Sequence, residues 1–138
     1  MKRILLSRSF RKQFKDYRRF VSETELVEDL KQVIRDGFRF GETKLKQLEI
    51  GKISLEILKL RFEEEKTKGR YLVGLVTKEG DYLPLYFALK KEKKGQNLGL
   101  TGPKKDRKVI FEALRRVVED YQQHSKEDPR IEEILVDT

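Results

Sequence analysis

The residues of this sequence whose types and spacing could do chemistry are cations at strand positions. Lys59 and Arg61 lie two residues apart inside an apolar stretch. Successive strand residues point to opposite faces, so both side chains project from one face. Arg70 opens the next apolar run, and a basic cluster at residues 90–94 follows the third. Three neighbouring strands would bring these cations onto one surface, which suits a polyanion better than a neutral metabolite.

Other catalytic arrangements find little support in the sequence. The single histidine, His124, cannot build a metal site alone, and we expect it to be solvated. Gly95, Gly99 and Gly102 lack the strand-to-helix context of a phosphate-binding loop. No serine or threonine has a nearby base that could activate it. We therefore expect neither a metal nor a cofactor.

A purely structural role is the alternative for the cations. Edge strands often carry Lys and Arg, which prevent pairing with other chains. Against this, Lys59 and Arg61 lie inside an apolar strand. Charge there costs free energy unless it faces a cleft or a partner.

Composition sets the outer limits. The chain has 138 residues and a net charge of +8, so we expect one domain with a real core and an anionic partner. Cysteine is absent, which favours a reducing cytosol. No apolar run reaches the length of a signal peptide core or a membrane helix, so we expect a cytoplasmic protein with no membrane partner.

Hydrophobic periodicity predicts an α+β fold in the order N-terminal strand, two-helix hairpin, three-stranded antiparallel meander and C-terminal helix. Ser22 to Glu25 match a capping box at the start of the second helix, and Gly37 is its expected end. The expected segments are a strand at 3–7, a basic helix from about residue 10, a loop at 38–54 with a short strand near 45–48, strands at 55–62, 70–77 and 82–89, a basic loop at 93–105, a helix at 106–124 and an acidic tail at 125–138. Residues 1–124 would form the single domain.

Three stretches resemble the RelE/ParE superfamily of type II toxin–antitoxin toxins. They are residues 57–61 (ILKLR), 68–73 (KGRYLV) and 85–93 (LYFALKKEK). In RelE-like toxins a "KLR" strand leads through a turn to "GYR" and an apolar strand, and a later strand ends in "KRER" or similar. The resemblance covers about residues 3–94. It implies a RelE-like fold and a metal-independent endoribonuclease that cleaves mRNA, usually on the ribosome.

The resemblance also implies roles for individual residues. Lys59 matches the lysine that acts on the attacking 2′-hydroxyl, and Arg61 matches a phosphate contact. Arg70 matches the arginine that stabilises the pentavalent phosphorane, and Lys91 matches a cation near the leaving group. Further RNA contacts are expected from Lys90, Lys93 and Lys94.

The chain departs from the family pattern at two places. Ile57 stands where the family has a further lysine, and the family tyrosine after the final basic cluster has no counterpart. Two other functions therefore stay open: a ParE-like inhibitor of DNA gyrase, and a non-catalytic basic domain that binds RNA. For a toxin, the resemblance implies a small acidic antitoxin as partner. Glu132 and Glu133 could imitate such a partner by covering the cations, unless the tail is frayed.

Overall fold

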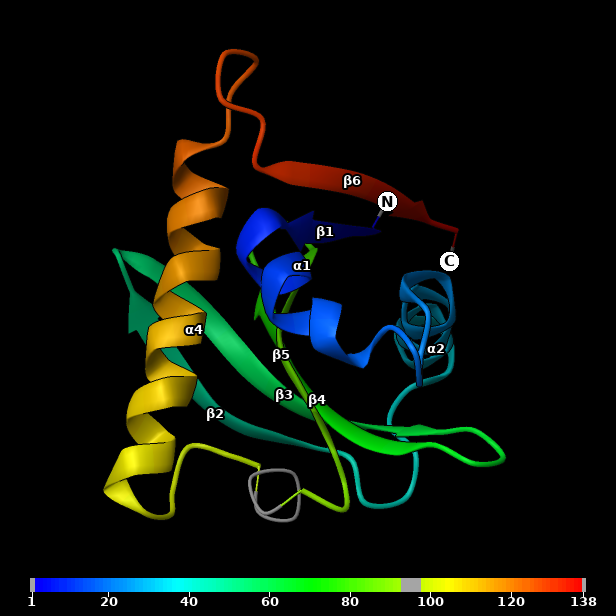
Figure 1. The fold of residues 1–138 in the computed structure, drawn as a ribbon. Helices are drawn as coiled ribbons and strands as arrows, with labels where there is room; N and C mark the ends of the chain where they lie inside the picture. The colour runs from blue at the N-terminus through cyan, green and yellow to red at the C-terminus, as the bar shows by residue number, and fades with distance from the viewer. Residues whose placement is uncertain (1, 93–97, 138) are drawn as a thin grey trace.

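The computed structural model describes residues 2–92 and 98–137, which form a sheet with helices around it (Figure 1). In chain order the elements are β1 (Lys2–Ser7), α1 (Arg8–Phe14), the 3-10 helix η1 (Lys15–Tyr17), α2 (Glu23–Asp36), β2 (Thr43–Ile50), β3 (Ile53–Glu63), β4 (Lys68–Val76), β5 (Asp81–Leu89), α4 (Lys104–Gln123) and β6 (Ile131–Val136). The predicted α+β class is thus confirmed. Among the described residues, no helix combines the length and the apolar character needed to span a membrane.

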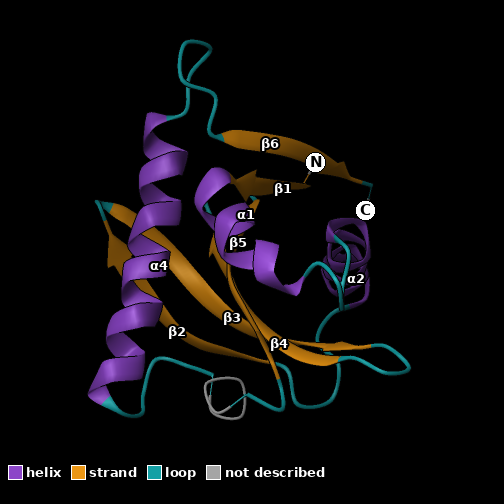
Figure 2. Ribbon diagram, in the orientation of Figure 1, coloured by secondary structure: helices purple, strands orange, loops and turns teal. Residues whose placement is uncertain are grey.

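The described strands form one six-stranded sheet in the order β2-β3-β4-β5-β1-β6 (Figure 2). β3, β4 and β5 are sequential antiparallel neighbours, as the sequence predicts. β1 joins the free edge of β5 in parallel, and β6 pairs antiparallel with β1. The meander is therefore the centre of a larger sheet, with β2 and β6 at its two edges.

Strand register divides the residues of the meander between two faces. Tyr71 lies opposite Leu60 on one side and Phe87 on the other, so these three share a face. We name it the α2 face, because Asp29 of α2 accepts a hydrogen bond from the Tyr71 hydroxyl. The α4 face is the opposite one, where Asp81 of β5 accepts a hydrogen bond from Tyr121 of α4.

The N-terminal helices occupy different positions around the sheet. The predicted capping box at α2 is present, with Ser22 and Glu25 each accepting the other's backbone N–H. α1 lies beside the free edge of β5, where the Gln13 amide bonds both the N–H and the carbonyl of Phe87. Figure 1 shows α1 from its side and α2 nearly end-on. The expected two-helix hairpin is therefore not observed. β1 pairs with β5 only at Arg3 and Ile4, and α1 lies along the rest of that edge.

Two strands differ from the sequence-based expectation. Residues 43–50 were expected to be mostly loop, but they form β2, paired with β3. A bulge between Lys44 and Lys46 breaks the alternation of Leu45, Leu48 and Ile50, which hides the strand from a period-two pattern. Likewise, the segment expected to be an acidic tail contains β6, whose partner β1 lies at the other end of the sequence.

Candidate nucleic-acid interface

Three of the expected site residues lie together on the α4 face. Arg61 of β3 and Arg70 of β4 are directly opposite each other, and Lys59 lies two residues before Arg61 on the same face. We call these three residues the cation cluster. Like charges placed opposite each other in a sheet destabilise it. An anionic ligand bound between the two arginines would relieve this repulsion.

The Arg61 side chain is held by the loop that precedes β2. Its Nη1 donates to the Phe40 carbonyl at 2.7 Å, and its Nη2 pairs with Glu63. Its Nε is buried and finds no hydrogen-bond partner among the described residues. Gly41 has a φ of 82°, and a Cβ atom there would lie 2.7 Å from the Arg61 Nη1. The positive φ favours glycine at this position, and a Cβ there would push the Arg61 side chain away from the loop.

Burial and mutual repulsion shift the pKa values of the cluster. The pKa of Lys59 is lowered by burial and then by the charge of Arg70. Burial also lowers the pKa of Arg70, with Arg61 as the next cause, and the Arg70 side chain is 12% exposed. The hydrogen bond from Arg61 holds the pKa of Glu63 below its usual range. Glu63 thus remains an anion that offsets part of the repulsion between the two arginines.

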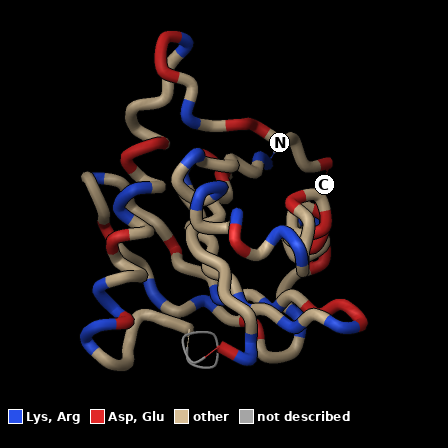
Figure 3. The backbone as a smooth tube through the Cα atoms, in the orientation of Figure 1, with Lys and Arg blue, Asp and Glu red and all other residues tan. Residues whose placement is uncertain are grey.

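Lys59 lines a hollow of about 440 Å³. One wall is the described part of the expected basic loop, residues 98–103, where Leu98 and Leu100 are buried. This loop leads directly into the first two turns of α4. Exposed cations follow there, namely Lys104, Lys105, Arg107 and Lys108. Figure 3 shows Lys and Arg gathered at the start of α4 and near the adjoining ends of the strands.

Side chains fix the backbone of Arg61, which lies beyond the end of the pairing between β2 and β3. β2 pairs with β3 only as far as Lys59. Beyond that point the Glu42 carboxylate accepts the Arg61 N–H at 2.8 Å, and Arg39 donates to the Arg61 carbonyl at 2.6 Å. These two side chains replace the missing ladder bonds and hold the cluster's central residue in register.

The same arginine links this support to α2. Arg39 forms a two-pronged pair with Asp29 at 2.7 and 2.9 Å, and it also donates to Glu42. Asp29 in turn accepts from Tyr71, and burial together with the Asp29 charge raises the pKa of that phenol well above its usual value. Burial alone would raise the pKa of Glu42, but the bonds from Arg39 and the Arg61 backbone hold it below its usual range. The cluster therefore rests on a charged network that crosses from one face of the sheet to the other.

The other described site residues, Lys90 and Lys91, do not join the cluster. The Lys91 ammonium lies 5.3 Å from the centre of the Phe20 ring, in a separate hollow of about 570 Å³ that Lys90 also lines. The expected placement of Lys91 beside Lys59 is not observed, because the chain turns toward Phe20 after Leu89. Lys93 and Lys94 lie outside the described residues.

Sequence reasoning missed an exposed aromatic beside the cluster. Phe40 is 93% exposed, and its ring centre lies 6.0 Å from the Arg61 guanidinium carbon. Phe38, in the same loop, is 50% exposed. An aromatic ring next to phosphate-binding cations is a platform on which a base can stack. The sequence signal was the pair of phenylalanines in the glycine-flanked segment 37–41.

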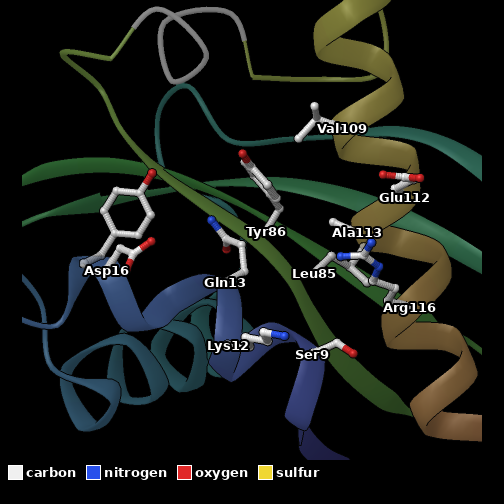
Figure 4. A pocket seen from close by; sticks show the side chains of 11 residues that line it. Ser9, Lys12, Gln13, Asp16, Leu85, Tyr86, Val109, Glu112, Ala113 and Arg116 are labelled. Atoms are coloured by element: carbon white, nitrogen blue, oxygen red, sulfur yellow. The ribbon is translucent and has the colours of Figure 1, made fainter.

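A third hollow, of about 520 Å³, lies between α1 and α4 over β5 (Figure 4). Its charged side chains balance, with Lys12 and Arg116 offset by Asp16 and Glu112. A hollow without net charge has little attraction for a polyanion, so we do not include it in the interface.

The acidic C-terminal segment does not cover the cation cluster. Glu132 pairs with Arg11, and Glu133 pairs with Arg3 at 3.0 Å. Both belong to β6, at the opposite edge of the sheet from β2 and β3. The idea that this segment shields the cations within the same chain is therefore wrong.

The sequence matches no family model and no curated protein. The resemblance to the RelE/ParE superfamily thus rests on the quoted residues alone and remains a hypothesis. In the part of the chain that the structure describes, no group of three or more His, Cys, Asp or Glu side chains is placed to hold a metal ion. The candidate site combines two arginines, an exposed aromatic ring and a partly buried lysine.

Proposed function

We propose that this chain is the toxin of a type II toxin–antitoxin system, a cytoplasmic RelE-like endoribonuclease that cleaves mRNA, with the ribosome presenting the message. One observation carries the proposal. Lys59, whose pKa is lowered, lies on the same sheet face as two arginines held side by side on adjacent strands. A base beside fixed phosphate-binding cations suits attack by a 2′-hydroxyl on the neighbouring phosphate.

The proposed reaction uses each member of the cluster differently. Neutral Lys59 Nζ takes the proton of the 2′-hydroxyl, whose oxygen forms a bond to phosphorus. The bond from phosphorus to the 5′ oxygen breaks, the 5′ oxygen takes a proton from solvent, and a 2′,3′-cyclic phosphate remains. Arg70 and Arg61 stabilise the charge that builds on the nonbridging oxygens. Lys91 is not given a leaving-group role, because its ammonium lies over Phe20.

The partners follow from the same surface. Single-stranded mRNA would place its phosphate on the cation cluster and a base on Phe40. The antitoxin would be a small acidic protein that covers the cluster, and its charge would complement the exposed cations at the start of α4.

Expression of the wild-type chain tests the proposal. We expect growth arrest with cuts in translated mRNA. Arg70→Ala should lower cleavage by about 10²–10³-fold, because it removes a donor aimed at transition-state charge. The variant should keep most RNA affinity, since one cation among many changes the salt-dependence slope by only about one. Arg70→Lys should recover part of the activity, because lysine keeps the charge but loses the planar fork.

Other outcomes would identify other functions. Intact mRNA together with stalled gyrase supercoiling would replace the proposal with ParE-like gyrase inhibition. Intact mRNA and normal supercoiling would leave the second candidate, a non-catalytic RNA-binding domain. One observation favours that candidate over gyrase inhibition: Lys90 and Lys91 contribute to a second basic surface, which suits the binding of an extended RNA strand.

A further inference from the structure

The hollow around Phe20 combines an aromatic floor with a basic rim. Among the described residues, four lysines line it, Lys66, Lys68, Lys90 and Lys91, against one acidic residue, Glu65. All four lysines are exposed. The volume of about 570 Å³ is large enough for a nucleotide, since ligand pockets typically start at about 300 Å³.

Phe20 is the feature that distinguishes this hollow from a simple basic patch. Its ring is partly buried against the core and carries the Arg19 guanidinium at 4.8 Å and the Lys91 ammonium at 5.3 Å. When a base stacks on the open side of the ring, these flexible cations would move aside and bind the phosphates that flank the base. This combination suits a single-stranded nucleic acid better than an acidic peptide, which has no base to stack.

The hollow is built from fixed parts of the chain. The Thr67 hydroxyl donates to the Phe20 carbonyl at 3.2 Å, which ties the segment between η1 and α2 to the turn between β3 and β4. The Lys90 N–H donates to the Lys68 carbonyl at 2.8 Å, which holds the end of β5 against the start of β4. These hydrogen bonds fix the backbone positions from which the Phe20 ring and two of the lysines project.

The hollow lies near the cation cluster along β4, although the cluster residues do not line it. Lys68, on its rim, is two residues from Arg70, a distance of about 7 Å along a strand. Glu63 lies opposite Lys68 and contacts Arg61, so the turn between β3 and β4 has the cluster on one side and the hollow on the other. A strand of RNA bound at the cluster could pass over the turn to Phe20.

We propose that the Phe20 hollow is a second nucleotide-binding subsite, in which the ring stacks on a base of single-stranded RNA and the surrounding lysines bind its phosphates. The subsite rests on the proposed function only in taking RNA as its ligand. It requires no cleavage, and it gives Lys91 a binding role in place of the leaving-group role that the sequence suggested.

The test measures binding with a ligand that cannot be cut. The probe is a fluorescent 2′-O-methyl oligouridylate of about ten nucleotides, which lacks the attacking hydroxyl, and its abasic counterpart of equal length is the second probe. Wild-type protein should bind the base-containing probe more tightly. Phe20→Leu keeps apolar packing but removes the aromatic plane, and it should weaken that binding about tenfold while leaving the abasic probe almost unaffected. Lys91→Gln should weaken both probes and reduce the salt-dependence slope by about one.

Two matched variants serve as controls. Phe111→Leu changes another partly buried phenylalanine on α4, and Lys126→Gln changes an exposed lysine near the C-terminus, both outside the hollow. Equal affinities of Phe20→Leu and Phe111→Leu for the base-containing probe would overturn the subsite, provided that both proteins melt as wild type. A Phe20-dependent preference in a protein that cuts no mRNA would support the subsite and reject the endoribonuclease. Cleavage of mRNA without such a preference would support the endoribonuclease and reject the subsite.

Discussion

Lys59 shows how a single residue acquires its properties from two neighbours in space. Lys59 is half-buried in β3, and its side chain shares a sheet face with that of Arg70. Both conditions penalise the protonated form, so the neutral amine is present at a lower pH than for a lysine in water. This is what a general base needs, and a surface lysine on a solvated edge would lack it.

A titration of Lys59 followed by NMR tests this coupling. We expect a pKa below the ordinary lysine value, and a partial rise in Arg70→Gln, because burial, the larger cause, remains. Between the folded pKa and the ordinary value the unfolded state binds more protons, so this residue makes the free energy of unfolding rise with pH in that window. Arg130→Gln, on the loop before β6, is the control and should leave the Lys59 titration unchanged. An ordinary pKa in the wild type would remove Lys59 as the proposed base.

Strand β4 connects the candidate site to the core through a glycine. A Cβ at Gly69 would lie 2.4 Å from the Phe87 ring. That ring cannot shift easily, because it is packed against Phe14, Tyr17 and Tyr71. The glycine before Arg70 thus brings the aromatic core close to the strand that carries the arginine.

Gly69→Ala should therefore destabilise the fold by about 1–3 kcal/mol, the usual cost of overpacking a core. Gly74→Ala is the matched control on the same strand. Its Cβ would meet only the ends of Leu85 and Leu55 side chains at 3.3 and 3.4 Å, which can give way. Urea unfolding of both variants measures the difference. Equal loss in both would show that the Phe87 ring adapts to the added methyl group.

At the scale of the whole molecule, charge is segregated across the sheet. The cation cluster lies on β3 and β4, whereas the acidic residues of β6 neutralise arginines of β1 and α1 at the far edge. The buried Val136 and the full register between β6 and β1 make the C-terminal strand part of the fold. We infer that β6 protects the edge of β1 and does not regulate the cluster.

Truncation after His124 should therefore lower the melting temperature without raising RNA affinity in the protein that remains folded. A double variant, Glu132→Gln with Glu133→Gln, keeps the strand and removes its anions. We expect its RNA affinity at about 0.15 M salt to match that of wild type, because charges more than about 8 Å apart are then screened. A several-fold gain in affinity for the double variant at this salt concentration would instead indicate that β6 competes with RNA.

Local patterns in the sequence were sufficient for the central meander, the capping box of α2, and the shared face of Lys59 and Arg61. These features depend on alternation or on contacts between residues a few positions apart, so the order of the residues is enough to predict them. Tertiary structure alone decided the features that join distant segments. The Lys91 ammonium lies over the Phe20 ring, and β6 pairs with β1. Arg39 links α2 to β3 through Asp29 and Glu42. Such contacts depend on where the whole chain folds back on itself, because each partner satisfies a charge, a backbone group or an apolar surface that its own neighbours in sequence leave open.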